Sequence, residues 1–225
     1  MLEYRYREGP EDGGTCVLLH GFGADAADLY PLADQLDPQG RLRWYFPEAP
    51  YRITYGGAAF GRAWFPRNEA EVAGALEGAY FRRLSEMDPE GLRLAGAEIE
   101  ELLQAVGADP RTLVLGGFSQ GAMVAVEALA RSSQPPADLW LFSGSAIAVK
   151  RWRVALGVER RFPFLQSHGT ADTILPIDGA RALFAMLDEA GGEGEFLSFD
   201  GGHGIPGEVL TRAGRRLQKV LQPPR

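Results

Sequence analysis

One short segment of the sequence has the residue types and spacing of a nucleophilic catalytic site. Gly117-Phe118-Ser119-Gln120-Gly121 follows an apolar run that predicts a strand, Thr112 to Leu115, and precedes a predicted helix from about Gln120 to Arg131. This arrangement is typical of a nucleophile elbow, in which a sharp strand-to-helix turn exposes a serine hydroxyl. Glycine on either side leaves room for strained backbone, and the helix N-terminus favours negative charge nearby. We therefore predict Ser119 as a nucleophile, against the simpler alternative of a glycine-rich strand end.

A serine hydroxyl needs a base to remove its proton, and the sequence offers three histidines, His20, His168 and His203. In hydrolases with such an elbow the chain order is serine, acid, histidine, which leaves His168 and His203. His168 precedes the best acid candidate, whereas His203 follows a predicted strand, Glu195 to Phe199. Elimination therefore selects His203 as the base.

A carboxylate should orient that histidine, and Asp172 is the best candidate. It lies in a loop between a predicted strand and a predicted helix, which places it on the same sheet edge as the histidine. Its competitors are less suitable, because Asp178 and Asp188 fall inside the predicted helix and Asp200 is only three residues before His203. The alternative role for Asp172 is a helix cap.

Two backbone N–H groups should stabilise the oxyanion of the tetrahedral intermediate, one after the nucleophile and one from a loop after an earlier strand. Gln120 supplies the first. The loop His20-Gly21-Phe22-Gly23 follows the predicted strand Thr15 to Leu19, and we predict the Phe22 N–H as the second donor. His20 precedes the serine and is predicted to brace this loop.

The elements that must position these residues alternate between short apolar runs and longer amphipathic stretches, a pattern typical of a mostly parallel sheet covered by helices on both faces. Further helices are predicted from a cap at Asp88 to Gly107, from Pro176 to Glu189 and from about Pro206. The predicted strands are Thr15 to Leu19, Leu42 to Phe46, Thr112 to Leu115, Leu139 to Phe142, Phe162 to Gln166 and Glu195 to Phe199.

The segment Tyr51 to Glu86 fits neither period and is predicted as a long irregular loop. Such loops often form pocket walls, so Trp64 and Phe65, with Phe22 and Ile174, are predicted to form an apolar acyl site. An aromatic loop on the surface is equally suited to the contact of a homodimer.

Composition narrows the function classes. The sequence has 225 residues, 45% of them hydrophobic, which predicts a single domain spanning residues 1–225 without a separate cap domain. Its net charge of −7 argues against a nucleic-acid partner, and without a long apolar run no stable membrane insertion or leader is expected, which predicts a cytoplasmic location. The single cysteine, Cys16, excludes an internal disulfide, and no metal site is predicted.

Several separated segments resemble blocks of the phospholipase/carboxylesterase family, which includes bacterial carboxylesterases and acyl-protein thioesterases of the α/β-hydrolase fold. The resemblance implies a triad of Ser119, Asp172 and His203, an oxyanion hole at Phe22 and Gln120, and no cofactor. The phenylalanine at position 22, where the family commonly has leucine, and Pro66, where an aspartate often stands, limit what is implied about the acyl pocket. The matching segments are Leu18 to Gly23, Phe46 to Pro50, Gly116 to Ala122, Leu165 to Asp172 and Gly202 to Ile205.

We therefore expect a serine hydrolase that cleaves small-molecule carboxylic esters of short to medium acyl chains, or thioesters, through an acyl-serine intermediate. Two rival hypotheses remain. A dienelactone-type lactone hydrolase usually has cysteine at the elbow, where this chain has Ser119. A non-catalytic ligand-binding protein of the same fold would not need an intact set of serine, aspartate and histidine.

Overall fold

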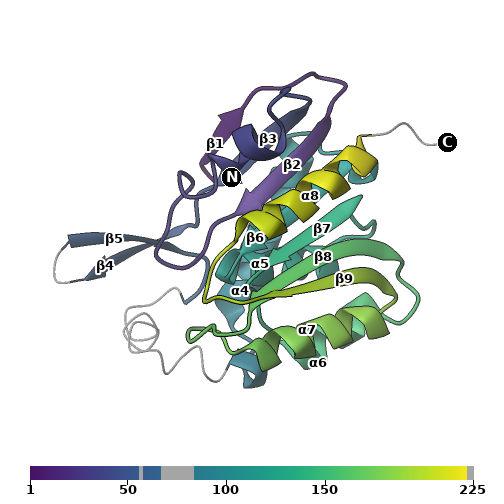
Figure 1. Ribbon diagram of the computed structural model, residues 1–225. Coiled ribbons are helices and arrows are strands. Elements are labelled where there is room, and N and C mark those ends of the chain that lie inside the picture. The colour runs from purple at the N-terminus through teal and green to yellow at the C-terminus, as the bar shows by residue number, and fades with distance from the viewer. Residues whose placement is uncertain (56–57, 67–83, 222–225) are drawn as a thin grey trace.

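A twisted, mostly parallel sheet organises the computed structural model, which describes residues 1–55, 58–66 and 84–221 (Figure 1). Its strand order is β1-β3-β2-β6-β7-β8-β9, and every neighbouring pair is parallel except β1 with β3. The carboxyl ends of the parallel strands therefore share one edge. The strands are β1 Tyr4–Arg7, β2 Gly14–Leu19, β3 Leu42–Pro47, β6 Leu113–Phe118, β7 Asp138–Phe142, β8 Phe162–Gly169 and β9 Gly192–Phe199.

All six predicted strands are present, which confirms the α/β class. The structure extends β6 to Phe118 and β8 to Gly169, so that His168 lies inside its strand and not after it. The sequence reading missed β1, whose YRYR sequence is polar and mostly exposed because it forms an antiparallel edge of the sheet.

Helices cover both faces of the sheet, as predicted (Figure 1). Residues of α1 and α8 pack with one side of the strands, and residues of α4, α5, α6 and α7 pack with the other. The helices are α1 Leu32–Leu36, α4 Glu90–Ala105, α5 Gln120–Arg131, α6 Val149–Leu156, α7 Ile177–Glu189 and α8 Gly207–Val220, with single 3₁₀ turns at Leu84–Glu86 and Pro110–Thr112.

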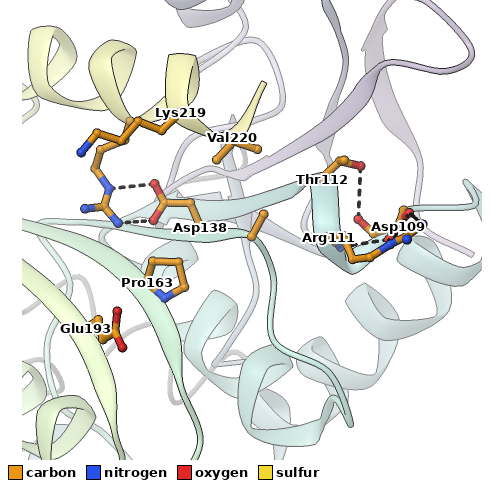
Figure 2. Close-up of a pocket in the computed structure, with 10 residues that line it drawn as sticks. Asp109, Arg111, Thr112, Asp138, Pro163, Glu193, Lys219 and Val220 are labelled. Atoms are coloured by element: carbon orange, nitrogen blue, oxygen red, sulfur yellow. Dashed lines mark hydrogen bonds and ion pairs between the residues drawn. The ribbon is translucent and has the colours of Figure 1, made fainter. Parts of the chain in front are cut away.

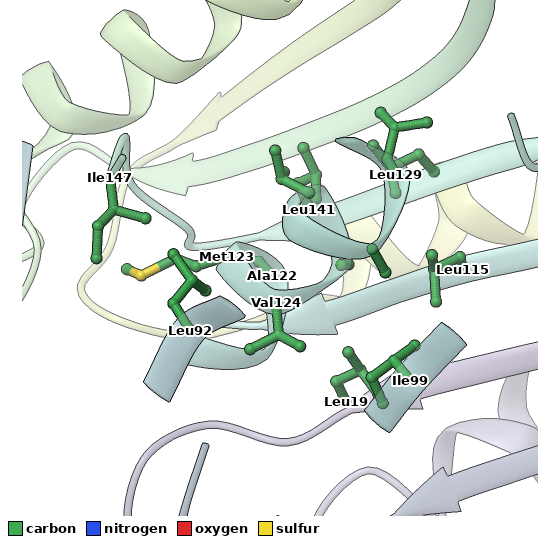
Figure 3. Close-up of a cluster of buried hydrophobic side chains, with 14 of the residues drawn as sticks. Leu19, Leu92, Ile99, Leu115, Ala122, Met123, Val124, Leu129, Leu141 and Ile147 are labelled. Carbon is green, nitrogen blue, oxygen red and sulfur yellow. The ribbon is translucent and has the colours of Figure 1, made fainter. Parts of the chain in front are cut away.

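Helix α5 is the centre of the larger core cluster. Ten consecutive residues of this helix, 120–129, are buried, because α4 packs on the side facing away from the strands. Figure 3 shows Met123 and Val124 among side chains from α4 and from the central strands. Each fully buried aliphatic side chain contributes about 1.5–3 kcal/mol to folding. The helix that follows the elbow is therefore buried in this core along most of its length.

The helices differ from the prediction in the cap of α4 and in the presence of α6. Pro89, not Asp88, is the N-cap of α4, and the Asp88 carboxylate instead pairs with Arg93 and Arg151. The short helix α6 was not predicted, although its Trp152 is fully buried and donates to the equally buried Glu127 at 2.7 Å. An eight-residue helix is too short for its apolar period to stand out from sequence.

Residues 51–55 and 58–63 form two paired strands, so the prediction of an irregular loop is wrong for these residues. Strand β4, Tyr51–Tyr55, pairs antiparallel with β5, Ala58–Ala63, with a register irregularity after Ile53. In the sequence the two strands flank Gly56-Gly57, a dipeptide typical of two-residue hairpin connections, which favours two paired strands over an irregular loop. Residues 67–83 of the predicted loop lie outside the described residues.

A charged hollow of about 810 Å³ lies at the amino edge of the strands (Figure 2). At its base Arg216 donates to the buried Asp138 at 2.7 Å, and Trp140 Nε1 donates to the same carboxylate at 2.9 Å. This hollow is at the opposite edge of the sheet from Ser119, so it takes no part in the site described next.

Candidate active site

The strand-to-helix turn at Ser119 has the strained backbone of a nucleophile elbow. Strand β6 ends at Phe118, α5 begins at Gln120, and the serine between them has φ 55° and ψ −115°. Positive φ is unusual for a residue with a side chain and marks strain at functional positions. Serine at a helix N-cap ordinarily bonds to the first turn, yet the Ser119 hydroxyl makes no capping bond to α5, all of which is described. The hydroxyl is thus left for another role.

The flanking glycines are required by space. A Cβ on Gly117 would lie 2.4 Å from the carbonyl carbon of Gly121, and a Cβ on Gly121 would lie 2.0 Å from the Leu19 oxygen. Real Cβ contacts are never this short, so any side chain at either position would push β6, α5 or the end of β2 apart. The elbow pattern in the sequence thus reflects a turn packed directly on neighbouring backbone.

Asp172 and His203 meet at the carboxyl edge of the sheet, as predicted by elimination. His203 Nδ1 and Asp172 Oδ2 are 2.6 Å apart, and the carboxylate side chain is fully buried. The loops that carry them are joined by backbone bonds, with Ala171 N–H donating to Gly201 O at 2.9 Å. This is the geometry in which a carboxylate orients an imidazole and stabilises its protonated form.

The other bonds to Asp172 keep it ionised. Oδ1 accepts from the backbone N–H groups of Ile174 and Leu175, each at 2.9 Å, and His168 Nε2 lies 3.3 Å from Oδ2. Burial raises the pKa of this carboxyl, but the hydrogen bonds from His168, His203 and Leu175 outweigh burial and hold the pKa well below its ordinary range. Asp172 is therefore a carboxylate at neutral pH.

His168, which the chain order disfavours as the base, lies beside Asp172. It is fully buried in β8, and its Nε2 donates to Leu175 O at 2.7 Å. A ring nitrogen engaged with that carbonyl cannot accept a proton from a serine. The rejected carboxylate Asp178 is exposed and pairs with Arg181 on its own helix.

Contacts on two sides of His203 hold the loop that carries it. The Phe118 and His203 rings lie 4.7 Å apart between centroids. The Ser143 hydroxyl donates to Gly204 O at 3.0 Å, and the backbone of Ser143 has a φ of 50°. Sequence reasoning missed Ser143, and an isolated Ser-Gly-Ser after a strand gives little signal of such a contact.

The loop after β2 lies against Ser119. A Cβ on Gly21 would be only 3.4 Å from Ser119 Cβ, so the loop predicted to carry an oxyanion donor is next to the predicted nucleophile. His20 braces it, with Nδ1 donating to Gly21 O at 2.8 Å and Nε2 accepting from Ala49 N–H at 3.1 Å. Burial lowers the pKa of His20, which favours the neutral ring that this pattern requires.

The residues predicted for the acyl site occupy different environments. Trp64 and Phe65 are fully buried in the core, whereas Ile174 is half exposed near the acid. Phe22 packs against the small cluster formed by Ile53 and Ala63 of the hairpin. The sequence reading gave Trp64 an acyl-site role and missed its hydrogen bonds, which reach His20 O through Nε1 and the Gln120 side chain through the backbone N–H, each at 2.9 Å.

Other kinds of site find no support in the described ranges. Within them, no group of three or more His, Cys, Asp or Glu side chains is placed to hold a metal ion. No helix in this part of the chain has the length and apolarity to cross a bilayer. Cys16 is fully buried on β2, and burial raises the pKa of its thiol, so it is no substitute for the elbow serine.

A mostly parallel sheet with a strained serine at a strand-to-helix turn, and an Asp-His pair on loops at the same edge, defines an α/β hydrolase. Residues 8–221 match the family model described as Phospholipase/Carboxylesterase. The chain belongs to this phospholipase/carboxylesterase family of enzymes.

Named relatives agree with the family. The chain is 26% identical to carboxylesterase SOBER1 of Arabidopsis thaliana, over 85% of this chain and 84% of the relative. It is 29% identical to acyl-protein thioesterase 1 of Eremothecium gossypii, over 88% and 83% respectively. Among solved structures, that of esterase PE8 superposes with a TM-score of 0.77 at 27% identity, covering 98% of this chain and 99% of the other.

Proposed function

We propose that this hydrolase cleaves carboxylic esters, and thioesters of the same acyl groups, through an acyl-serine intermediate. The observation that carries the proposal is the 2.6 Å contact between His203 and Asp172 on the sheet edge where the strained Ser119 turn also lies. Relatives named carboxylesterase and acyl-protein thioesterase support both leaving groups.

In the proposed mechanism Ser119 Oγ attacks the acyl carbon while His203 Nε2 takes its proton. Asp172 holds the Nδ1–H and stabilises the imidazolium. The N–H groups of Phe22 and Gln120 donate to the oxyanion, and His203 returns the proton to the departing alkoxide or thiolate. Water then attacks the acyl-serine while His203 takes its proton, and the carboxylate product leaves as His203 returns the proton to Ser119. These steps need no metal or organic cofactor.

The proposed substrates are small molecules with short to medium acyl chains. Of the four residues predicted for the acyl site, Phe22 and Ile174 have exposed surface that can meet a substrate, whereas Trp64 and Phe65 have none and would support the site from the core. A net charge of −7 supports a neutral small molecule over a nucleic acid as the partner. A cytoplasmic location and a homodimer are also proposed, and cell fractionation and equilibrium sedimentation test them.

The test combines labelling with kinetics. A fluorophosphonate should label wild-type protein at Ser119 and leave Ser119→Ala unlabelled, and the variant should lose the burst of nitrophenol. Ser145→Ala, a buried serine off the elbow, is the matched control. Labelling that persists in Ser119→Ala, or wild-type protein inert to both reagents, would favour the non-catalytic alternative.

A chain-length series of nitrophenyl esters, run beside an acyl thioester, then identifies the acyl group. Rates that peak at short or medium chains support the proposed substrate class. A peak at long chains would contradict it, and preference for an unsaturated lactone would favour the dienelactone-type alternative.

A further inference from the structure

Strand β5 runs beside the loop that carries Phe22, one of the two proposed oxyanion donors. Gly23 N–H donates to Arg62 O, and Arg62 N–H donates to Ala24 O, each at 2.9 Å. These two bonds lie on both sides of one residue of β5, so they fix the loop in register with the strand. The backbone on the C-terminal side of Phe22 is therefore held by pairing with β5.

The contact between this strand and the loop leaves no free space. Gly61 has φ 130°, and a Cβ built on it would lie 2.0 Å from Gly23 O. Gly23 has φ 81°, and its own Cβ position is 3.0 Å from the Phe60 ring. Glycine at position 61 is required both by backbone conformation and by the close approach of the loop.

Two residues after Arg62, the same segment reaches Gln120, the other proposed oxyanion donor. Trp64 N–H donates to Gln120 Oε1 at 2.9 Å, and both side chains are fully buried. Gln120 Nε2 has no hydrogen-bond partner among the residues that the structure describes, so Oε1 is the anchored end of this amide. The side chain of Gln120 thus ties the start of α5 to the strand that also holds the loop after β2.

The Arg62 side chain closes the network around the loop. Its Nη1 donates to Ala49 O at 3.1 Å, and its Nε lies 3.0 Å from a carboxylate oxygen of Glu48. Ala49 N–H in turn donates to His20, which donates to Gly21 O. The loop is therefore held from its own strand, from the end of β3 and from β5 together.

We propose that residues 61–64 are a positioning segment that sets the spacing between the two oxyanion donors, with the Gln120 side chain as its anchor on the nucleophile helix. This inference rests on the proposed function, because it assigns a role in stabilising the oxyanion. The two donors come from different elements, β2 and α5, and segment 61–64 is bonded to both. A donor displaced by a few tenths of an ångström loses much of a contact that is made only in the transition state.

Two variants disturb the two ends of the segment independently. Gly61→Ala forces the strand away from Gly23, and Gln120→Met keeps the side-chain length but removes the acceptor for Trp64 N–H. Gly40→Ala is the matched control, since Gly40 also has positive φ, 62°, but has nothing within 4 Å of its Cβ position. Urea unfolding measures the folded fraction of each variant, so that loss of fold is separated from loss of rate.

The readouts are kcat and KM for a nitrophenyl ester and the Ki of an alkyl trifluoromethyl ketone, which forms an oxyanion when serine adds to it. We expect kcat to fall by about 10–100-fold in each variant, with KM within about twofold and Ki raised by the same factor as kcat falls. Gly40→Ala should keep wild-type kcat. The inference is overturned if both variants match Gly40→Ala in kcat per folded molecule, or if KM rises while kcat and Ki stay unchanged.

Wild-type protein in the same assays separates this inference from the function on which it rests. If fluorophosphonate does not label wild-type Ser119, the proposed function itself fails. If wild-type protein is labelled and turns over ester while both variants do the same at wild-type rate, only the role of segment 61–64 is refuted.

Discussion

Replacing Asp172 by Asn tests the proposed role of His203 as the base, because the structure fixes which way the new amide must face. Ile174 and Leu175 both direct N–H donors at Oδ1, each at 2.9 Å, so the amide oxygen of Asn must take that position. Its NH₂ group then faces His203 Nδ1, where Oδ2 lay at 2.6 Å. The His203 ring must then present an unprotonated Nδ1 to this donor and carry its proton on Nε2. In that tautomer it cannot accept the proton of Ser119.

The expected loss in kcat is about 10⁴-fold, the size found for the same change in a serine protease triad. This corresponds to roughly 5 kcal/mol in the barrier, at about 1.4 kcal/mol per tenfold change. KM should change little, because Asp172 does not touch substrate in the proposed mechanism. The assay is steady-state nitrophenyl ester hydrolysis at neutral pH, with urea unfolding beside it.

Asp178→Asn is the matched control, since this exposed carboxylate pairs only with Arg181 among the contacts described and should keep full activity. Asp172→Asn with kcat within tenfold of wild type would refute the tautomer argument. So would an equal loss in Asp178→Asn, which would make that residue the acid.

Three further outcomes follow from other contacts. The pKa of Asp172 is lowered on folding, so the ionised side chain stabilises the fold above the ordinary carboxyl range, and this stabilisation is lost as pH falls below it. The difference in unfolding free energy between wild type and Asp172→Asn should therefore be full at about pH 6 and shrink below about pH 4. Urea titration at each pH measures it. Ser143→Ala removes the 3.0 Å bond to Gly204 O beside the base and should lower kcat about fivefold, for a bond of about 1 kcal/mol; unchanged kcat would contradict this. Glu127→Ala leaves the Arg151 guanidinium without its buried partner at 2.7 Å and should cost about 3 kcal/mol of stability in urea unfolding with kcat per folded molecule unchanged.

The sequence predicted the parts of this molecule whose signals are local. Ser119 is identified by glycines that the turn requires and by the strand and helix around it. His203 followed from the small number of histidines, and Asp172 from its place after a strand. The parallel sheet was predicted because each buried strand is a short apolar run, which helices then separate along the chain.

The parts that the sequence did not predict depend on contacts between distant segments. Nothing near Trp64 in the chain indicates that its N–H meets Gln120, 56 residues away. Strand β1 is recognisable only beside β3, because its own residues face solvent. Aromatic residues of segment 51–86 suggested a pocket wall, and the burial of Trp64 shows that an aromatic near a site can serve the core as much as the ligand.

The burial of α5 also decides how the enzyme should fail on heating. Amide protons of residues 124–129 lie in the most buried helix of the described chain, so they should exchange with solvent only when the whole domain opens. The β4–β5 hairpin has much less packing beneath it and should open at lower free energy. Since this hairpin holds the loop opposite Ser119, turnover should be lost while the nucleophile helix is still protected from exchange.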